Sequence, residues 1–422
     1  MNKIKRNILP IYIIINILYV LIGGFLVVTN LVNSKYISYG NIFVLLPLNI
    51  IMAIIFRKKF KKDVMYIPLL AIFFFGIIST IFAFKPNVAL FGEAKRYEGL
   101  FMIAYYLSLV VLSSLLDKKD KKKIVIAIIV VGIIEVIFGL IQKFSLFGFP
   151  QYIHKGKIFF NGLTTNPNFL GSLILISLCY SIGLFFDSKH KILYFIISLF
   201  LLSGLYLTNT LSSLVGFIFV LLYIIVYSIK NKQLKKMFVI LLSSASLLLV
   251  FHFTNQTTLV NDLNSFKRET SQMITGSYKS DYDFGTGRVD IWKRTLKYVP
   301  QNMMTGVGLD NFKYIKNGRP FYRYGVSYDK VHNEYLQFLI TGGIFYLLSY
   351  LTLYGIIVLR GVKYSFKNKE LYLIIPVIGY LVQAFFNISV IEVAPFFYIV
   401  LGLNSKRWLY GTRSIIISNE FR

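Results

Sequence analysis

Long apolar segments alternate with short polar segments along almost the whole chain. Each apolar segment has about the length that a bilayer core of roughly 30 Å requires of a spanning helix. Twelve such segments can be delimited, near residues 9–30, 37–56, 64–84, 99–116, 124–142, 168–186, 191–208, 211–229, 237–254, 333–359, 371–391 and 393–405. The pattern predicts an all-α integral membrane protein with about twelve transmembrane helices, of which the last is the shortest.

One long hydrophilic segment, residues 255–332, separates the ninth and tenth predicted spans. The chain has no internal repeat of a fixed period, no Pro-rich linker and no low-complexity tract. The basic amino terminus is followed by an apolar segment that is long enough to span and lacks a clear small-residue cleavage site, so we interpret it as the first transmembrane helix. We therefore predict a single polytopic membrane domain, residues 1–422, with one large inserted loop, residues 255–332.

The composition agrees with a protein that lies in lipid. Of the 422 residues, 56% are hydrophobic and only 15% are charged, which is more apolar than a soluble core of this length needs. The single cysteine, Cys179, lies inside an apolar segment and therefore excludes disulfides within the chain and any Cys-based metal site.

The distribution of charge predicts the orientation of the helices. The net charge of +28 does not indicate a nucleic-acid partner, because the Lys and Arg residues lie in short clusters between apolar segments and form no basic face. With a cytoplasmic amino terminus, the segments predicted inside hold 27 of the 46 Lys and Arg residues. Both termini are then cytoplasmic and the loop 255–332 is extracytoplasmic. Its 12 basic residues do not contradict this, because long loops cross largely regardless of charge.

The large loop contains a predicted amphipathic helix. Four of its apolar residues recur at helical spacing, namely Val289, Trp292, Leu296 and Val299. Pro300 marks the end of this helix, and Thr286 and Gly287 are suited to its cap and turn. Arg288 would then lie at the helix start, where free backbone N–H groups and the helix dipole favour an anion such as phosphate. The alternative is a solvated charge on a surface helix.

His332 is the leading candidate for a catalytic base. It lies where the loop meets the tenth predicted span and is flanked by Asn333 and Glu334. Imidazole is the side chain best suited to exchange protons near neutral pH. The alternative is an interfacial histidine that binds backbone at a helix start. Asn333 beside it is a candidate for substrate contact.

Three further arginines in predicted outside loops are candidates for anion binding. Arg96, in the second outside loop, has the reach to contact a diphosphate at the outer headgroup level, and its alternative role is a headgroup anchor. Arg319 and Arg323 lie in the aromatic, basic stretch before His332 and are weaker candidates for contact with phosphate or glycan.

Two other motifs have structural interpretations. The glycines at 306 and 308 lack the third glycine and the preceding strand of a dinucleotide site, so we predict a turn there. Asn166 precedes Pro167 at the start of the sixth predicted span, which is the usual arrangement of a helix cap.

Several classes of protein lack their required residues in this chain. There is no HExxH, no Cys or His cluster with metal spacing, no GxxxxGK[ST] and no GxSxG, so a metalloprotease, a P-loop motor and a serine hydrolase are excluded. No metal site or cofactor is predicted. Glu135 is the only carboxylate well inside a predicted span, whereas a proton-coupled carrier usually needs several ionisable groups there. A transporter, such as a flippase for lipid-linked oligosaccharides, is therefore the second hypothesis.

An ordered set of motifs gives the chain a family resemblance. In sequence order they are RYEGL at 96–100, NPN at 166–168, GRVDIW at 287–292, GVGLDNF at 306–312 and HNEYLQFLITGG at 332–343. With these motifs the chain resembles the O-antigen ligase and O-antigen polymerase superfamily of bacterial membrane proteins. Members of that family often have an arginine near the start of the second span after the one that begins at NPN. Here the corresponding run, residues 207–213, has none.

The resemblance implies a GT-C-type membrane glycosyltransferase of the bacterial cytoplasmic membrane, working without metal. Its donor would be a glycan on undecaprenyl diphosphate, and its acceptor a hydroxyl of a lipid, a glycan or a protein. By matching position, His332 would be the base, Arg288 would bind the diphosphate, and Arg96 would be a further diphosphate contact. Ligase and polymerase share this donor chemistry and differ in the acceptor, so the sequence does not separate them or identify the sugar.

Overall fold

The computed structural model describes residues 3–149, 151–154, 157–275, 288–316, 318–319, 322–323 and 326–405. Within this part of the chain, seven helices or continuous helical segments are long and apolar enough to cross a membrane. They are α1 (Lys3–Val28), α2 to α3 (Ser34–Ile55), α7 (Lys118–Lys143), α8 (Pro167–Asp187), α10 (Leu211–Lys230), α11 (Leu234–Phe253) and α15 (Ile344–Asn368). The prediction of a multi-pass helical membrane protein is therefore confirmed.

Five shorter apolar helices complete the bundle. They are α4 (Tyr66–Ile81), α6 (Leu100–Ser114), α9 (Lys191–Leu207), α16 (Ile375–Ala384) and α17 (Ala394–Leu403). Together with the seven long segments, they follow the order of the twelve predicted spans. Because these five are shorter than a full bilayer crossing requires, the count of twelve spans stays a prediction.

The remaining elements are short. One continuous segment passes from α2 (Ser34–Gly40) through a π-helical turn (Asn41–Leu45) into α3 (Leu46–Ile55), and α5 (Pro86–Phe91) precedes α6. Two antiparallel hairpins pair β1 (Tyr152–His154) with β2 (Lys157–Phe159) and β3 (Tyr322–Arg323) with β4 (Val326–Ser327). Single helical turns cover Arg57–Lys59, Leu146–Gly148, Pro300–Asn302 and Phe312–Tyr314.

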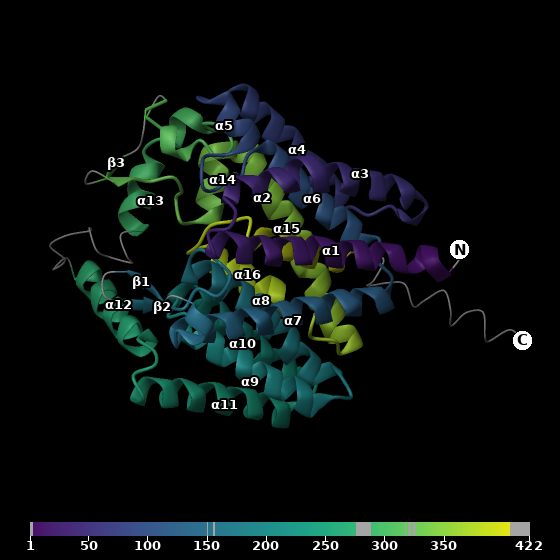
Figure 1. Ribbon diagram of the computed structural model, residues 1–422, viewed down its shortest axis with the longest axis vertical. Coiled ribbons are helices and arrows are strands. Elements are labelled where there is room, and N and C mark those ends of the chain that lie inside the picture. Colours follow the sequence, from purple (N-terminus) through teal and green to yellow (C-terminus); the bar gives the residue numbers. More distant parts are fainter. Residues whose placement is uncertain are drawn as a thin grey trace, which may run out of the picture.

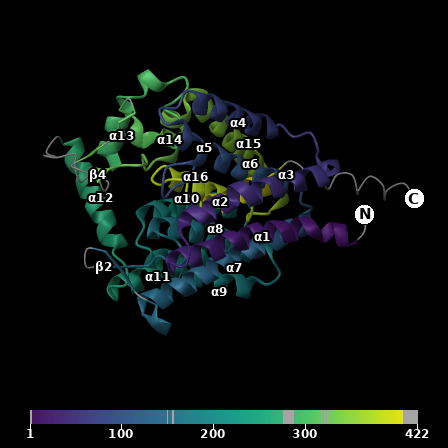
Figure 2. The ribbon, with the colours of Figure 1, turned by 45° about the horizontal axis from the view of Figure 1, so that its top comes forward.

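Helix α8 lies at the centre of the bundle. Its apolar window is entirely covered by other helices. Figure 2 shows α8 and α16 in the interior, with α4 and α15 along one side and α1, α7 and α9 along the other. Small hydroxyl residues let the helices approach α8 closely, because Ser177 Oγ donates to Ile128 O (2.9 Å) and Ser181 Oγ to Tyr194 O (2.9 Å). The outer helices, such as α11 at one edge of Figure 1, expose large apolar side chains as a lipid-facing surface does.

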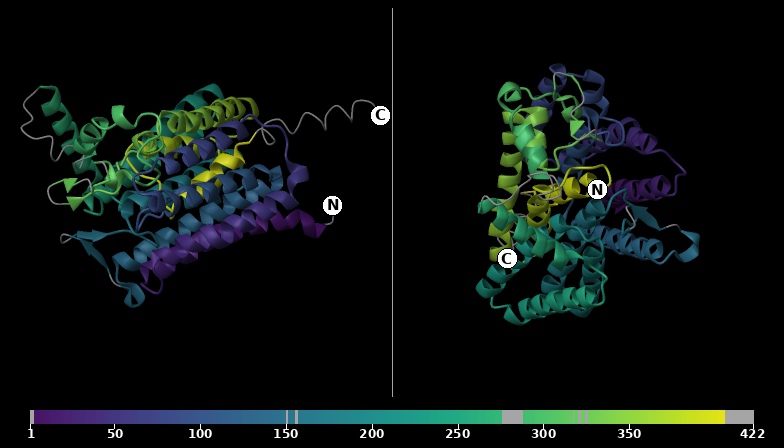
Figure 3. Two further views of the ribbon diagram at one scale, coloured as in Figure 1. Left: turned by 90° about the horizontal axis from the view of Figure 1, so that it is seen from above. Right: turned by 90° about the vertical axis from the view of Figure 1, so that its left-hand side faces the viewer.

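Segments that were predicted to lie on one side of the membrane contact one another at one end of the bundle. Phe84 N donates to Val307 O (3.2 Å), and Lys143 Nζ donates to Gln256 Oε1 (2.6 Å). Figure 3 shows α12, α13 and both hairpins gathered at this end, whereas the amino-terminal end of α1 lies at the opposite end.

Segments predicted to be cytoplasmic meet at that opposite end. Arg360 Nη1 pairs with Asp63 Oδ1 (2.6 Å), and Lys118 Nζ pairs with Glu370 Oε1 (2.8 Å). The contacts thus agree with the predicted division into extracytoplasmic and cytoplasmic loops, with one set at each end of the bundle. Which end faces the cytoplasm stays a prediction from the charge distribution.

The tenth predicted span, residues 333–359, is not one continuous helix. It consists of α14 (Glu334–Gly342) and α15, separated at Gly343 by a positive φ of 83°. The loop causes this break, because Ile344 N donates to Met303 O (2.7 Å) and the backbone of Met304 fills the space that a Cβ at position 343 would need. Only glycine fits this approach.

The described part of the large loop has its own small core. Its buried apolar residues come from three stretches of the loop and from α14, and they are Ile291, Val307, Phe312, Ile315, Val331 and Ile340. The predicted amphipathic helix is present as α13 (Arg288–Leu296), and α12 (Leu259–Ile274) was not predicted. The predicted apolar face of α13 is partly wrong, because Ile291 is buried whereas Leu296 is 53% exposed.

Candidate active site

His332 lies at the junction of the loop with α14, in a backbone conformation that its neighbours fix. Its φ is +57°, a left-handed value that non-glycine residues adopt uncommonly. On one side, Val331 N donates to Gln337 Oε1 (2.9 Å) and Val331 O accepts from Trp292 Nε1 (3.1 Å). On the other, the Asn333 side chain caps α14 by accepting from Leu336 N (2.9 Å). Hydrogen bonds therefore fix the backbone on both sides of His332.

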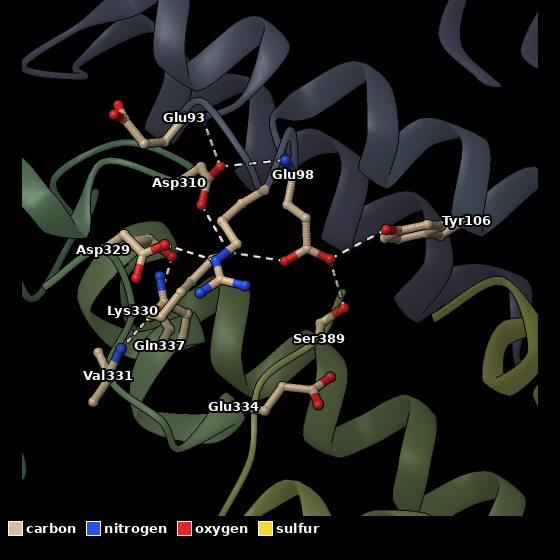
Figure 4. A network of polar contacts seen from close by, with 12 residues as sticks. Glu93, Glu98, Tyr106, Asp310, Asp329, Lys330, Val331, Glu334, Gln337 and Ser389 are labelled. Atoms are coloured by element: carbon tan, nitrogen blue, oxygen red, sulfur yellow. Dashed lines mark hydrogen bonds and ion pairs between the residues drawn. The ribbon is translucent and has the colours of Figure 1, made fainter. Parts of the chain in front are cut away.

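Two residues before His332, Lys330 is buried between two carboxylates. Its Nζ lies 2.8 Å from Glu98 Oε2 and 2.7 Å from Asp310 Oδ1, and only 4% of its side chain is exposed. Figure 4 shows the two carboxylates converging on this ammonium from separate parts of the chain. We call Lys330, Glu98 and Asp310 the Lys330 triad. Burial alone would lower the pKa of Lys330, but the charges of Asp310 and Glu98 raise it, so the ammonium stays charged.

The carboxylates of the triad are themselves held in place. Asp310 Oδ2 accepts from the backbone N–H groups of Glu93 (2.7 Å) and Glu98 (3.2 Å). Glu98 Oε1 accepts from Tyr106 Oη–H (3.1 Å) and Ser389 Oγ–H (2.9 Å). The network thus ties the His332 segment to the connection before α6, to α6 itself and to the connection between α16 and α17.

A small cavity lies beside the triad. Its volume is about 30 Å³, and Glu334 and Gln337 are among its lining residues. This volume is enough for one or two water molecules and not for a sugar. Glu334 borders the network in Figure 4, and its Oε1 has no partner among the described residues.

Arg96 reaches the same segment through a second ion pair. Its Nε lies 2.6 Å from Asp329 Oδ2, and its guanidinium group lies over the ring of Phe169, 5.7 Å from the ring centre. Burial would raise the pKa of Asp329, but the charge of Arg96 lowers it, so Asp329 is ionised at neutral pH. The guanidinium group of Arg96 is thus engaged by Asp329 and Phe169 within the protein.

The surroundings of His332 keep its imidazole neutral. Burial lowers its pKa to about 4, and the positive charge of Arg288 acts in the same direction. Arg96 and Lys330 add smaller effects of the same sign, whereas Asp329 opposes them. A neutral imidazole is the form that accepts a proton, so His332 is in the correct state for a general base at neutral pH.

Arg288 is the cation near His332 for which the described residues provide no partner. It is the first residue of α13 and is half-buried, and burial lowers its pKa. Within the part of the chain that the structure describes, its guanidinium group has no hydrogen-bonded or ion-paired partner. A desolvated arginine is normally paired, so Arg288 stays a candidate for binding an anion. Thr286 and Gly287, the predicted cap and turn, lie outside the described residues.

The other predicted residues have varied positions. Arg319 is exposed and takes part in a β-bridge with Lys316, away from the contacts described above. Arg323 lies in β3, and its side chain lies outside the described part of the structure. Asn333 uses its side-chain oxygen as the helix cap. The structure brings Arg288 and Arg96 near His332, where their charges act on the imidazole.

The two motifs with structural interpretations are confirmed. Gly306 and Gly308 form a turn with φ of 70° and 104°, and Gly308 N donates to Thr341 O (3.1 Å). Asn166 caps α8 by accepting from Asn168 N (2.9 Å), with Pro167 as the first residue of the helix.

Glu135 and the run at 207–213 are both used to hold loops. The Glu135 Oε2 in α7 accepts from Leu163 N (2.7 Å) and so fixes the connection before α8. Asn209, in the run that lacks the family's arginine, accepts from Thr257 Oγ1 (2.7 Å) and Thr258 N (2.8 Å) at the start of the large loop. These contacts give both positions a structural role.

The sequence analysis did not assign roles to Lys330, Glu98, Asp310 or Asp329. Lys330 was counted among the basic loop residues, and Asp310 was quoted within a motif. The one available signal was a charged pair, Asp329 and Lys330, placed directly before the candidate histidine. Among the described residues, no group of three or more His, Cys, Asp or Glu side chains is arranged to hold a metal ion.

Comparison with known proteins places a family domain over this site. Residues 196–351 match the model of the O-antigen ligase family. This range runs from α9 into α15 and includes Arg288, Lys330 and His332, whereas Arg96 and Glu98 precede it. The match confirms the resemblance to the O-antigen ligase and polymerase superfamily. No curated protein matches the sequence.

Proposed function

Because residues 196–351 match the O-antigen ligase family, we propose that this membrane protein transfers a glycan from undecaprenyl diphosphate to an acceptor hydroxyl at the outer face of the cytoplasmic membrane. The observation that supports the proposal is the proximity of a neutral His332 to a half-buried Arg288, which has no partner among the described residues. A base and an anion-binding cation are the two elements that this reaction requires.

In the proposed reaction, the acceptor oxygen attacks the anomeric carbon of the donor sugar while His332 accepts the hydroxyl proton. The bond between that carbon and the diphosphate oxygen breaks, and its electron pair leaves with the lipid diphosphate. Negative charge on the diphosphate increases during this step, so a fixed cation near it stabilises the transition state. Arg288 supplies that cation from the start of α13, where the helix dipole has the same favourable sign.

Arg96 is proposed as the second diphosphate contact. It would replace the arginine that the family often has at the position corresponding to residues 207–213 of this chain. Its Nε is engaged by Asp329, and the terminal nitrogens of a guanidinium group can bind a phosphate at the same time. Two guanidinium groups aimed at one diphosphate perform the electrostatic task of a divalent metal, so the proposed mechanism is metal-independent. Arg319 and Arg323 remain candidates for contact with the glycan chain, and Asn333 acts by capping α14 beside the base.

The proposal is tested by glycan transfer in membranes that contain the protein. Purified undecaprenyl-diphosphate-linked oligosaccharide is the donor, no divalent metal is added, and lipid, glycan and protein acceptors are offered separately. Product with the wild type and none with His332→Ala or Arg288→Ala supports the proposal, and the acceptor that is consumed separates a ligase from a polymerase. Movement of the donor across the bilayer without product would instead support the transporter hypothesis.

A further inference from the structure

The Lys330 triad is a second polar structure at the site, and the proposed reaction does not use it. All three side chains are buried, with exposed fractions of 4% for Lys330, 5% for Glu98 and 0% for Asp310. Burial of three charges costs free energy that well-packed apolar residues would not require, so a buried ionic network is poor support for stability alone. A role in fixing one geometry accounts for its presence better.

The triad fixes the path of the backbone directly before His332. Lys330 lies two residues before His332, and the Asn333 cap follows directly after it. A chain held at both of these points has little freedom in between, and His332 adopts the uncommon left-handed conformation there. Such a conformation persists only where the surrounding contacts determine it.

The triad also connects distant parts of the chain at this point. Lys330 and Glu98 are 232 residues apart in sequence, and Glu98 accepts from Ser389, which is 291 residues away. Asp310 joins them from the turn that follows Gly308. Contacts with the membrane domain, and not only contacts within the large loop, therefore fix the position of the His332 segment.

We propose that Lys330 is a positioning residue, which locks the His332 segment onto the membrane domain through Glu98 and Asp310 and so sets the distance between the base and the acceptor hydroxyl. This inference rests on the proposed function for its catalytic part. Lys330 is itself shielded from the substrate by its burial, so it acts through His332 and does not bind the donor.

The first test compares Lys330→Met, Lys330→Arg and a control in the glycan-transfer assay. A misplacement of about 1 Å at a reacting group costs roughly 100-fold in rate, so we expect Lys330→Met to lower kcat by about that factor with the donor KM unchanged. Lys330→Arg keeps the charge and should restore much of the rate. The control is Arg360→Met, which breaks the partly buried pair with Asp63 (2.6 Å) at the opposite end of the bundle. It should lower thermal stability and leave kcat unchanged.

A triple variant separates positioning from stability. Lys330→Met alone leaves two carboxylates buried without their cation, which destabilises the fold. Adding Glu98→Gln and Asp310→Asn removes those charges and should restore the melting temperature without restoring kcat. Recovery of kcat in parallel with the melting temperature would overturn the positioning role, as would a loss in Lys330→Met that appears in KM and not in kcat.

If the wild-type protein transfers no glycan, the proposed function is refuted. Hydrogen exchange then still tests whether Lys330 holds the His332 segment in place. In Lys330→Met, backbone amides of residues 328–337 should exchange faster, while amides of α8 should not change. Unchanged exchange in residues 328–337 would contradict the claim that Lys330 holds this segment in place, regardless of which reaction the protein catalyses.

Discussion

The guanidinium Nε of Arg96 lies 2.6 Å from Oδ2 of Asp329, three residues before His332. This pair brings a residue that precedes the domain matching the O-antigen ligase family, residues 196–351, into contact with the segment of the candidate base. Asp329 has two effects there, since it holds Arg96 in place and raises the pKa of His332 against the neighbouring cations. The site is thus assembled from the amino-terminal helices and the domain together.

The pH dependence of transfer should report the surroundings of His332. The base must be neutral, and its pKa in the free protein is about 4, so kcat/KM should be constant at neutral pH and fall as the pH drops through about 4. In the donor complex, the negative diphosphate should raise the pKa of His332, so the acid limb of kcat should lie at a higher pH than that of kcat/KM. Identical acid limbs would place the diphosphate away from His332.

Arg288→Ala should weaken transfer without weakening the fold. The substitution removes charge-assisted hydrogen bonds to the diphosphate, which are worth about 1.5–3 kcal/mol each, so kcat/KM should fall roughly 10- to 100-fold. The melting temperature should hardly change, because Arg288 has no partner in the described part of the structure. Arg268→Ala is the matched control, since Arg268 is an exposed arginine on α12 of the same loop. Equal losses in both variants would point to a general effect of loop charge.

The break between α14 and α15 should depend on Gly343. Any side chain there meets the backbone of Met304 and is strained by the φ of +83°, so Gly343→Ala should lower the melting temperature clearly. Gly355 offers a matched control within α15, because a Cβ there meets nothing within 4 Å. In a helix interior, alanine is favoured over glycine by about 0.5–1 kcal/mol, so Gly355→Ala should be neutral or stabilising. Equal melting temperatures for the two variants would contradict this account of the break.

The orientation of the bundle can be measured with single cysteines. Cys179 is buried, so it should not react with a membrane-impermeant maleimide in intact cells. Asn264→Cys, exposed on α12, should be labelled from outside, whereas Lys61→Cys, exposed near the Asp63 end, should be labelled only after the cells are opened. The reverse pattern would invert the predicted topology and place the site in the cytoplasm.

The fold was predictable where one local property determines the structure. Apolar length predicted the helical segments, and helical spacing predicted α13, although this helix ends at Leu296 and not at Pro300. The break at Gly343 was not predictable, because it depends on the backbone of Met304, which only the folded loop brings there. The same limit applied to the site, since His332 and Arg288 have recognisable chemistry whereas Lys330 acquires its role from Glu98, which is 232 residues away.

The central claim is that His332 is the base for glycan transfer, and a single-turnover measurement tests it most directly. Purified protein in excess over undecaprenyl-diphosphate-linked oligosaccharide is mixed with acceptor, and the rate of product formation is compared between wild type and His332→Gln, with donor binding measured separately. General base catalysis typically contributes about 100- to 10,000-fold, so His332→Gln should bind the donor normally and transfer it at least about 100-fold more slowly. Transfer by His332→Gln at the wild-type rate would show that another group accepts the proton.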